Sequence, residues 1–193
     1  MDENRARRII VGITGASGVI YGIRLLEVLR ECGVESHLIL SDTSKKNILS
    51  ETSSTVAAVE ALAHKVYCQD NLAASLSSGS FRTDGMVVVP CTIKTLSGIA
   101  CSYNDTLIVR AADVCLKERR RLVLVVRETP LHLGHLRLME AVTEAGAIVL
   151  PPVPAFYLRP RTISDLIDHT VGRILDLLLI EHTLSCRWEG EEG

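Results

Sequence analysis

The chain has 193 residues, a formal net charge of −2 and 47% hydrophobic residues, values that suit one globular domain. A charge so close to zero excludes the global basic field that holds nucleic acid or an anionic membrane. The longest apolar runs, such as the one within residues 121–126, are far too short to span a bilayer. The first ten residues lead into a glycine turn instead of a signal-peptide core. We therefore expect one cytoplasmic domain that covers residues 1–193.

The expected elements alternate between strand and helix along the whole chain. Mainly apolar segments predict buried strands at residues 8–13, 85–89, 122–126 and 147–150, and residues 35–40 are expected to form a further strand that ends at Ser41. Apolar residues at helical spacing predict helices at residues 19–32, 45–50, 55–64, 95–102, 106–119, 133–144 and 163–179. Buried strands separated by amphipathic helices are typical of a parallel sheet covered on both faces. The expected fold is a three-layer, doubly wound α/β sheet, which binds its ligand at the carboxyl ends of its strands.

The first two strand ends carry polar residues that suit more than one kind of ligand. The first strand runs into the turn GITGASG (residues 12–18) and then into a helix, whose free N–H groups favour a phosphate. Packing alone is the alternative explanation of these glycines. Their spacing differs from the dinucleotide pattern G-x-G-x-x-G, and Ser17 lacks the G-x-S-x-G setting of a serine hydrolase. The second strand ends in Ser41-Asp42, where the acid suits an adenosine ribose and the serine suits a smaller ligand.

The later strand ends add charge and an aromatic ring. After Pro90, hydroxyl residues and Lys94 open a helix and offer donors to an anion or a polar ring edge, although Thr92 also suits a helix N-cap. Arg127 and Glu128 directly follow a buried strand, either as site residues or as a structural ion pair. The last strand runs into PPVPAFY, in which prolines stiffen a loop that presents Tyr157.

Metal and disulfide chemistry have little support. The six cysteines, at positions 32, 68, 91, 101, 115 and 186, form no C-x-x-C pair and favour structural thiols of a reducing compartment. His132 and His135 stand three residues apart near an expected helix start, with no cysteine or third histidine near them. A helix cap or a surface pair is therefore favoured over metal ligation.

Taken together, these segments resemble the flavin prenyltransferases of the UbiX family. The matching stretches stand in the family's order and cover almost the whole chain: GITGASGVIYGIRLLEVLR, SSGSFRTDGMVVVPCTIKTLSGI, RAADVCLKERR, VRETPLHLGHLRLM and PPVPAFY. The resemblance implies a Rossmann-like or flavodoxin-like fold and homo-oligomers, commonly dodecamers, with sites shared between chains. It also implies a metal-independent transfer of the dimethylallyl group of dimethylallyl monophosphate to N5 and C6 of reduced FMN. The product, prenylated FMN, would serve a UbiD-type decarboxylase in quinone biosynthesis or in the breakdown of aromatic acids.

The same resemblance assigns site residues. The FMN contacts that it implies are Gly15, Ala16, Ser17, Ser41, Thr92, Ile93, Lys94, Thr95 and Arg127. The substrate contacts that it implies are Lys117, Tyr157, Arg173, Arg110 and Trp188. The catalytic residues that it implies are Glu128, Lys117, Ser17, Glu51 and Tyr157. Thr92 replaces the serine of many relatives and keeps its hydroxyl, and the stretch after Leu179 matches poorly except for Arg187-Trp188.

Three other functions remain possible on this fold. Flavin-dependent decarboxylases of a peptidyl or pantothenoyl cysteine carry a histidine before the third strand and a P-A-S-A-N-T segment after it. Residues 75–78 and 90–95 match neither feature. A flavin-carrying accessory subunit of an aromatic-acid decarboxylase needs no second phosphate site. The presence of such residues therefore favours catalysis; they are Lys117, Glu128, Tyr157 and Arg173. The glycine spacing argues against the third function, that of an NAD-dependent oxidoreductase.

Overall fold

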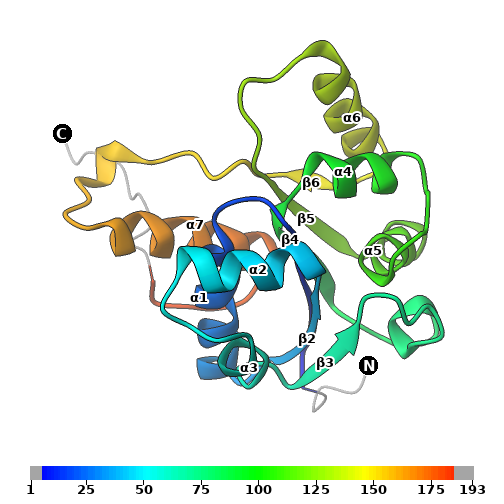
Figure 1. Ribbon diagram of the computed structural model, residues 1–193, viewed down its shortest axis with the longest axis horizontal. Coiled ribbons are helices and arrows are strands. Elements are labelled where there is room, and N and C mark those ends of the chain that lie inside the picture. Colours follow the sequence, from blue (N-terminus) through cyan, green and yellow to red (C-terminus); the bar gives the residue numbers. More distant parts are fainter. Residues whose placement is uncertain (1–5, 185–193) are drawn as a thin grey trace.

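Short runs of aliphatic residues form one parallel sheet in the computed structural model, which describes residues 6–184 (Figure 1). The strands are β1 (Arg8–Ile13), β2 (Glu35–Leu40), β3 (Lys65–Cys68), β4 (Gly85–Cys91), β5 (Arg121–Val126) and β6 (Ile148–Val149). Their order across the sheet is β3-β2-β1-β4-β5-β6, and each neighbouring pair is parallel. This is the order of a doubly wound Rossmann sheet, so the expected fold class is confirmed.

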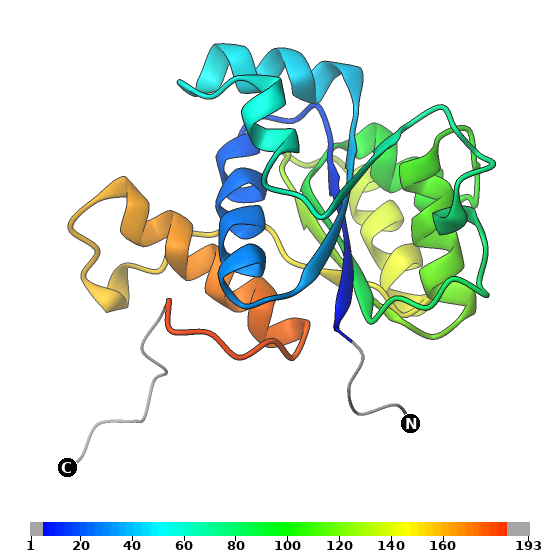
Figure 2. The same ribbon diagram turned by 90° about the horizontal axis from the view of Figure 1, so that it is seen from below.

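Helices cover both faces of the sheet (Figure 2). They are α1 (Val19–Glu31), α2 (Asp42–Glu51), α3 (Val56–Glu60), α4 (Ile93–Ala100), α5 (Leu107–Lys117), α6 (Leu133–Glu144) and α7 (Ile163–Leu177), with short 3-10 turns η1 (Ser75–Ser77) and η2 (Phe156–Leu158). Helices α1 and α7 lie on one face, α4, α5 and α6 lie on the other, and α2 lies at the edge where the strands end. Within residues 6–184, none of the helices has both the length and the apolar character needed to cross a membrane.

Several elements differ from the sequence-based expectations; α2 begins at Asp42 instead of residue 45, and α4 begins at Ile93 instead of residue 95. Strand β3 was not expected, because only Tyr67 of its four residues is buried and an edge strand of this kind carries no continuous apolar run. Strand β4 continues past Val89 to Cys91, with an irregular register against β5 where Pro90 has no N–H to donate. Helix α3 ends at Glu60 instead of residue 64.

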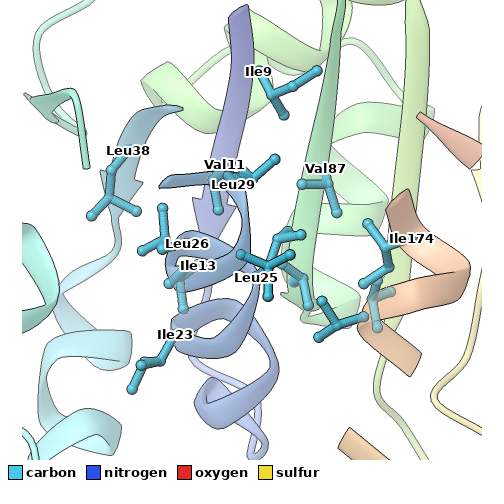
Figure 3. Close-up of a cluster of buried hydrophobic side chains, with 14 of the residues drawn as sticks. Ile9, Val11, Ile13, Ile23, Leu25, Leu26, Leu29, Leu38, Val87 and Ile174 are labelled. Carbon is cyan, nitrogen blue, oxygen red and sulfur yellow. The ribbon is translucent and has the colours of Figure 1, made fainter. Parts of the chain in front are cut away.

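Alternating strand residues separate the interior into two hydrophobic layers. Ile9, Val11 and Ile13 of β1 pack under α1 and α7 (Figure 3), whereas Ile10 faces the layer that includes α4, α5 and α6. Leu25 of α1 is fully buried against the first layer. Because both faces are covered, ligands reach the sheet at the ends of its strands.

Candidate functional site

Buried Thr14 joins the ends of β1 and β4, at the point where the strand order reverses. Its N–H and its Oγ1 both donate to the carbonyl oxygen of Pro90, over 3.2 and 2.7 Å. The same Oγ1 accepts the N–H of Thr92 at 2.9 Å. On the other side of β4, Arg127 N donates to Cys91 O at 3.1 Å. These bonds fix the positions of three segments relative to one another: the first turn, the start of α4 after β4, and the start of the loop that leads from β5 to α6.

The glycines of the first turn serve two different purposes. A Cβ on Gly15 would lie 2.5 Å from Cβ and Cγ2 of Thr43, so this glycine lets the turn pack against α2. Gly18 is the N-cap of α1 with φ +99°, a left-handed conformation that favours glycine, and it has no side chain to cap the helix. Glu51, the last residue of α2, supplies that cap, because its Oε2 accepts the N–H groups of Gly18 (2.8 Å) and Val19 (3.4 Å).

A cleft of about 810 Å³ opens beside this junction. The starts of two helices line it: Ser41 caps α2 by accepting Ser44 N at 3.1 Å, and Thr92 caps α4 by accepting Thr95 N at 3.2 Å. Helix starts present N–H groups and partial positive charge, which suit an anion. Thr92 is therefore a helix cap and a lining residue at once. The arrangement provides hydroxyl and N–H donors for a phosphate, with the exposed Lys94 at the rim.

A second cleft, of about 700 Å³, lies on the other side of the first turn. Ser17 and Glu51 line it together with Arg127 and Glu128 from the end of β5. Arg127 and Glu128 are both exposed, and Glu128 Oε1 accepts the N–H of Thr129 at 3.0 Å. The pair is thus available to a ligand in this cleft and is not a buried ion pair.

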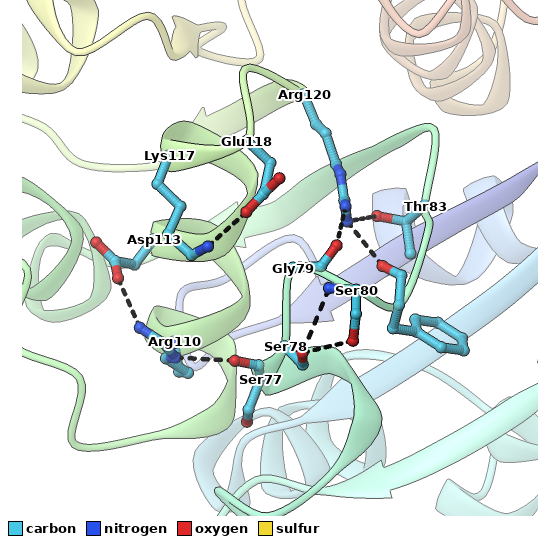
Figure 4. Close-up of polar contacts among 11 residues, drawn as sticks. Ser77, Ser78, Gly79, Ser80, Thr83, Arg110, Asp113, Lys117, Glu118 and Arg120 are labelled. Carbon is cyan, nitrogen blue, oxygen red and sulfur yellow. Dashed lines mark hydrogen bonds and ion pairs between the residues drawn. The ribbon is translucent and has the colours of Figure 1, made fainter.

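Arg110 and Lys117 line neither cleft and lie on α5 (Figure 4). Helix α5 runs opposite to the strands, so Lys117, its last residue, lies at the edge where the strands begin. Arg110 donates to Ser77 O (3.1 Å) and pairs with Asp113 (3.0 Å). Lys117 pairs with Glu118 and, through its hydrogen bond and positive charge, lowers the pKa of that carboxyl.

Tyr157 and Arg173 form a further group beside α7. Tyr157 lies in η2, is 65% exposed, and meets the ring of His169 edge-on at a centroid distance of 6.4 Å. Arg173 is exposed one turn further along α7 and pairs with Asp176 at 3.0 Å. Burial, together with the nearby charge of Arg173, lowers the pKa of His169. Trp188 lies outside the described residues.

The structure therefore divides the expected site residues between two places. Those at the strand ends converge on the two clefts: Gly15, Ser17, Ser41, Glu51, Thr92, Lys94, Thr95, Arg127 and Glu128. Ala16 lies within the turn between them, and Ile93 is the first residue of α4. Arg110, Lys117, Tyr157 and Arg173 lie away from the clefts of their own chain.

Asp42, which the sequence offered as a ribose ligand, does line the larger cleft, but several other lining residues were not expected from the sequence. Thr43 follows Asp42 in α2, and Gln69 follows β3, a strand that the apolar pattern did not reveal. Tyr103 and Asp105 come from the connection between α4 and α5, and Asp105 lies 3.9 Å from Lys94. Thr43 was detectable as the continuation of a polar strand end, whereas Gln69, Tyr103 and Asp105 reach the cleft only through the fold.

The two histidines at the start of α6 act as a cap. His132 Nδ1 accepts the N–H of Gly134 at 3.0 Å, and the ring of His135 stacks on it at a centroid distance of 3.6 Å. The helix-cap interpretation is thus confirmed. No three His, Cys, Asp or Glu side chains within residues 6–184 are grouped as metal ligands would be. The cysteines of this part of the chain are free thiols, and burial raises the pKa of Cys91 and of Cys115 to about 12.

A Rossmann-ordered sheet with two capped helix starts at its switch point defines an α/β protein of the nucleotide- or flavin-binding class. The family model described as "Flavoprotein" matches residues 1–175. The flavin prenyltransferase UbiX of Thauera aromatica is 54% identical over 185 residues, which cover 96% of this chain and 95% of that protein.

Two solved structures are similar along nearly the whole chain. The crystal structure of AnUbiX (PadA1) in complex with FMN and dimethylallyl pyrophosphate has a TM-score of 0.96 and 53% identity, over 97% of this chain and 100% of that one. The dodecameric FMN-dependent UbiX-like decarboxylase from Escherichia coli O157:H7 has a TM-score of 0.92 and 49% identity, over 95% and 100% of the two chains. The chain belongs to the flavoprotein family and, within it, to the UbiX-like flavin prenyltransferases, which are transferases.

Proposed function

We propose that this enzyme joins the dimethylallyl group of dimethylallyl monophosphate to N5 and C6 of reduced FMN without a metal ion. The product, prenylated FMN, would pass to a UbiD-type decarboxylase. The AnUbiX (PadA1) neighbour, described as a complex with FMN and dimethylallyl pyrophosphate, supports both the acceptor and the class of donor. The alignments span nearly the full length of this chain and of its relatives, which supports the assignment of the whole reaction to this chain.

The larger cleft suits FMN. The N-terminal ends of α2 and α4, with the hydroxyls of Ser41, Thr92 and Thr95, provide neutral donors and partial positive charge for a phosphate and a polar ring edge. The turn from Gly15 to Ser17 forms the boundary with the second cleft. Bound reduced FMN supplies the electron-rich ring that accepts the prenyl group. The chain's own residues would hold that ring in the larger cleft.

The second cleft suits the reacting ends of the two substrates. Breaking the bond between the allyl carbon and the phosphate oxygen leaves negative charge on the phosphate, which cationic side chains stabilise. Arg127 is the cation that this chain places in the cleft. Glu128 lines the same cleft and would accept the proton that leaves C6, and Glu51 fixes the start of α1 beside Ser17.

We infer that the remaining phosphate ligands come from other copies of the chain. Arg110 and Lys117 are held by Asp113, Glu118 and the carbonyl of Ser77 on the outer side of α5 (Figure 4). From there they line neither cleft of their own chain. The solved UbiX-like neighbour from E. coli O157:H7 is described as dodecameric, which supports a shared site.

The exposed loop around η2 supports the same inference. Val153, Phe156 and Ile163 are 68%, 71% and 78% exposed, beside the equally exposed Tyr157. Large apolar side chains in this number around one loop are typical of a surface that another chain covers. Tyr157 and Arg173 would then reach the second cleft of a neighbouring copy.

The observation that carries the proposal is the convergence of Ser17, Glu51, Arg127 and Glu128 on one cleft beside the flavin-sized one. The test is anaerobic incubation of the purified protein with reduced FMN and dimethylallyl monophosphate, followed by mass spectrometry of the flavin. We expect a gain of one C5 unit, and a parallel reaction with the diphosphate measures the choice of donor. Unchanged FMN with either donor contradicts the proposal. In Glu128→Gln the ring closure should slow, and an unchanged rate removes Glu128 as the base.

Mixed assemblies test the shared site. Lys117→Ala and Glu128→Gln chains should each be slow alone, because every site contains one defect. Co-expressed, they should regain part of the activity, since some sites then combine an intact Lys117 with an intact Glu128. Activity that stays at the level of the separate variants would place both residues in one chain's site.

A further inference from the structure

One face of α2 contacts the backbone of the first turn from end to end. Thr43, Asn47 and Glu51 are spaced four residues apart and therefore lie on the same side of the helix. Thr43 packs against Gly15 so closely that a Cβ there would have no room. Asn47 Nδ2 donates to the carbonyl oxygens of Gly15 (3.1 Å) and Ala16 (3.2 Å).

The polarity of this helix face matches the turn. Asn47 supplies a donor with two hydrogens where the turn presents two carbonyl oxygens, and Glu51 supplies an acceptor where the turn presents the N–H groups of Gly18 and Val19. Neither carbonyl belongs to a regular element, because the turn lies between β1 and α1. Without Asn47, both would lose a partner that no strand or helix replaces.

We propose that Asn47 is a positioning residue for the flavin. It holds the carbonyls of Gly15 and Ala16 toward α2, so that the other side of the turn faces the two clefts that Gly15 and Ser17 line. Asn47 lines neither cleft itself, and its effect on the reaction passes through the turn. The proposal rests on the proposed function, because it assigns this turn to the FMN site.

The exchange of one atom distinguishes this role from simple packing. Asn47→Asp keeps the size of the side chain but replaces the amide donor by a carboxylate, which has no hydrogen to donate and faces two carbonyl oxygens. Asn47→Ala removes the donor and the packing of the side chain together. Lys46→Ala is the matched control, since Lys46 is exposed on the adjacent position of the same helix.

The first measurement is the dissociation constant of FMN for each full-length protein at pH 7.5, taken as a ratio to that of the unaltered protein. We expect a roughly tenfold weaker affinity in Asn47→Ala, because the turn loses both hydrogen bonds that hold its carbonyl oxygens. Asn47→Asp should bind at least as weakly, because its carboxylate cannot donate, whereas Lys46→Ala stays at a ratio near one. An Asn47→Asp protein that binds FMN as tightly as the unaltered protein overturns the donor role.

A second measurement needs no flavin. Amide hydrogen exchange of the segment at residues 14–18 should speed up in flavin-free Asn47→Asp and Asn47→Ala, and stay unchanged in Lys46→Ala. No change in any variant overturns the inference. If the unaltered protein itself binds no FMN, the proposed function fails, while faster exchange in the Asn47 variants still supports the contact between α2 and the turn.

Discussion

Replacing Thr14 by valine tests whether one hydroxyl holds the strand ends in place. The change keeps the shape of the side chain, which is 2% exposed, but removes Oγ1. Pro90 O then loses its 2.7 Å partner and keeps only Thr14 N, while Thr92 N loses its acceptor altogether. One lost hydrogen bond costs about 1 kcal/mol, and a stranded N–H about 1–3 kcal/mol, so we expect a loss of about 2–4 kcal/mol in the free energy of unfolding.

The assay is urea unfolding at pH 7.5, with Thr14→Ser as the control because serine keeps the oxygen at the same place. Thr14→Val should unfold at a clearly lower urea concentration than Thr14→Ser with a similar slope, and it should bind FMN more weakly, since Thr92 opens the helix that lines the larger cleft. Equal midpoints for the two variants would refute the reasoning, because a methyl group would then replace the hydroxyl without cost.

Two further predictions concern the first turn and the buried histidine. Gly15→Ala should lose about 1–3 kcal/mol of stability and weaken FMN binding, because its Cβ would lie 2.5 Å from atoms of Thr43; a melting temperature equal to that of the unaltered protein speaks against the packing argument. Burial lowers the pKa of His37 to about 4, below the ordinary value of about 6.5. As the pH falls through that range the unfolded chain binds the proton first, so stability should decrease by roughly 3 kcal/mol, at about 1.4 kcal/mol per unit. Between pH 7 and pH 5, urea midpoints should show about 2 kcal/mol of this loss in the unaltered protein and in His64→Gln, and a much smaller loss in His37→Leu. The same loss in all three would be contrary evidence.

The sequence was sufficient to predict the strands and helices whose residues are buried without interruption or at regular helical spacing. Strands β1 and β5, and β2 from Leu38 onward, are aliphatic on both faces because helices cover both faces. Helix α6 is bounded by a capping residue and a glycine. Strand β3 escaped detection because an edge strand with one buried residue has no such pattern. The extension of β4 through Pro90 depends on neighbours that accept an irregular register, which is a property of the sheet and not of the segment.

The candidate site was predictable in part for the same reason. Parallel strands end at one edge, so polar residues after each strand must lie near one another, as Ser17, Glu128 and Thr92 do. Lys117 lies at the other edge of the sheet, because a helix that connects two parallel strands runs back along the sheet and ends where the strands begin. What no local pattern reveals is the contact of α2 with the first turn, since it joins side chains and backbone groups about thirty residues apart.

The loose attachment of α6 has a consequence for motion. Val142 is the fully buried residue of α6, with Leu138 and Met139 partly buried, whereas α1 is buried along one whole side. A helix held by so few buried side chains opens locally at a free energy well below that of global unfolding. The backbone amides of α6 should therefore exchange with deuterium long before those of α1. Since the loop with Arg127 and Glu128 leads directly into α6, the wall of the second cleft is expected to fluctuate while the turn that borders the flavin stays still.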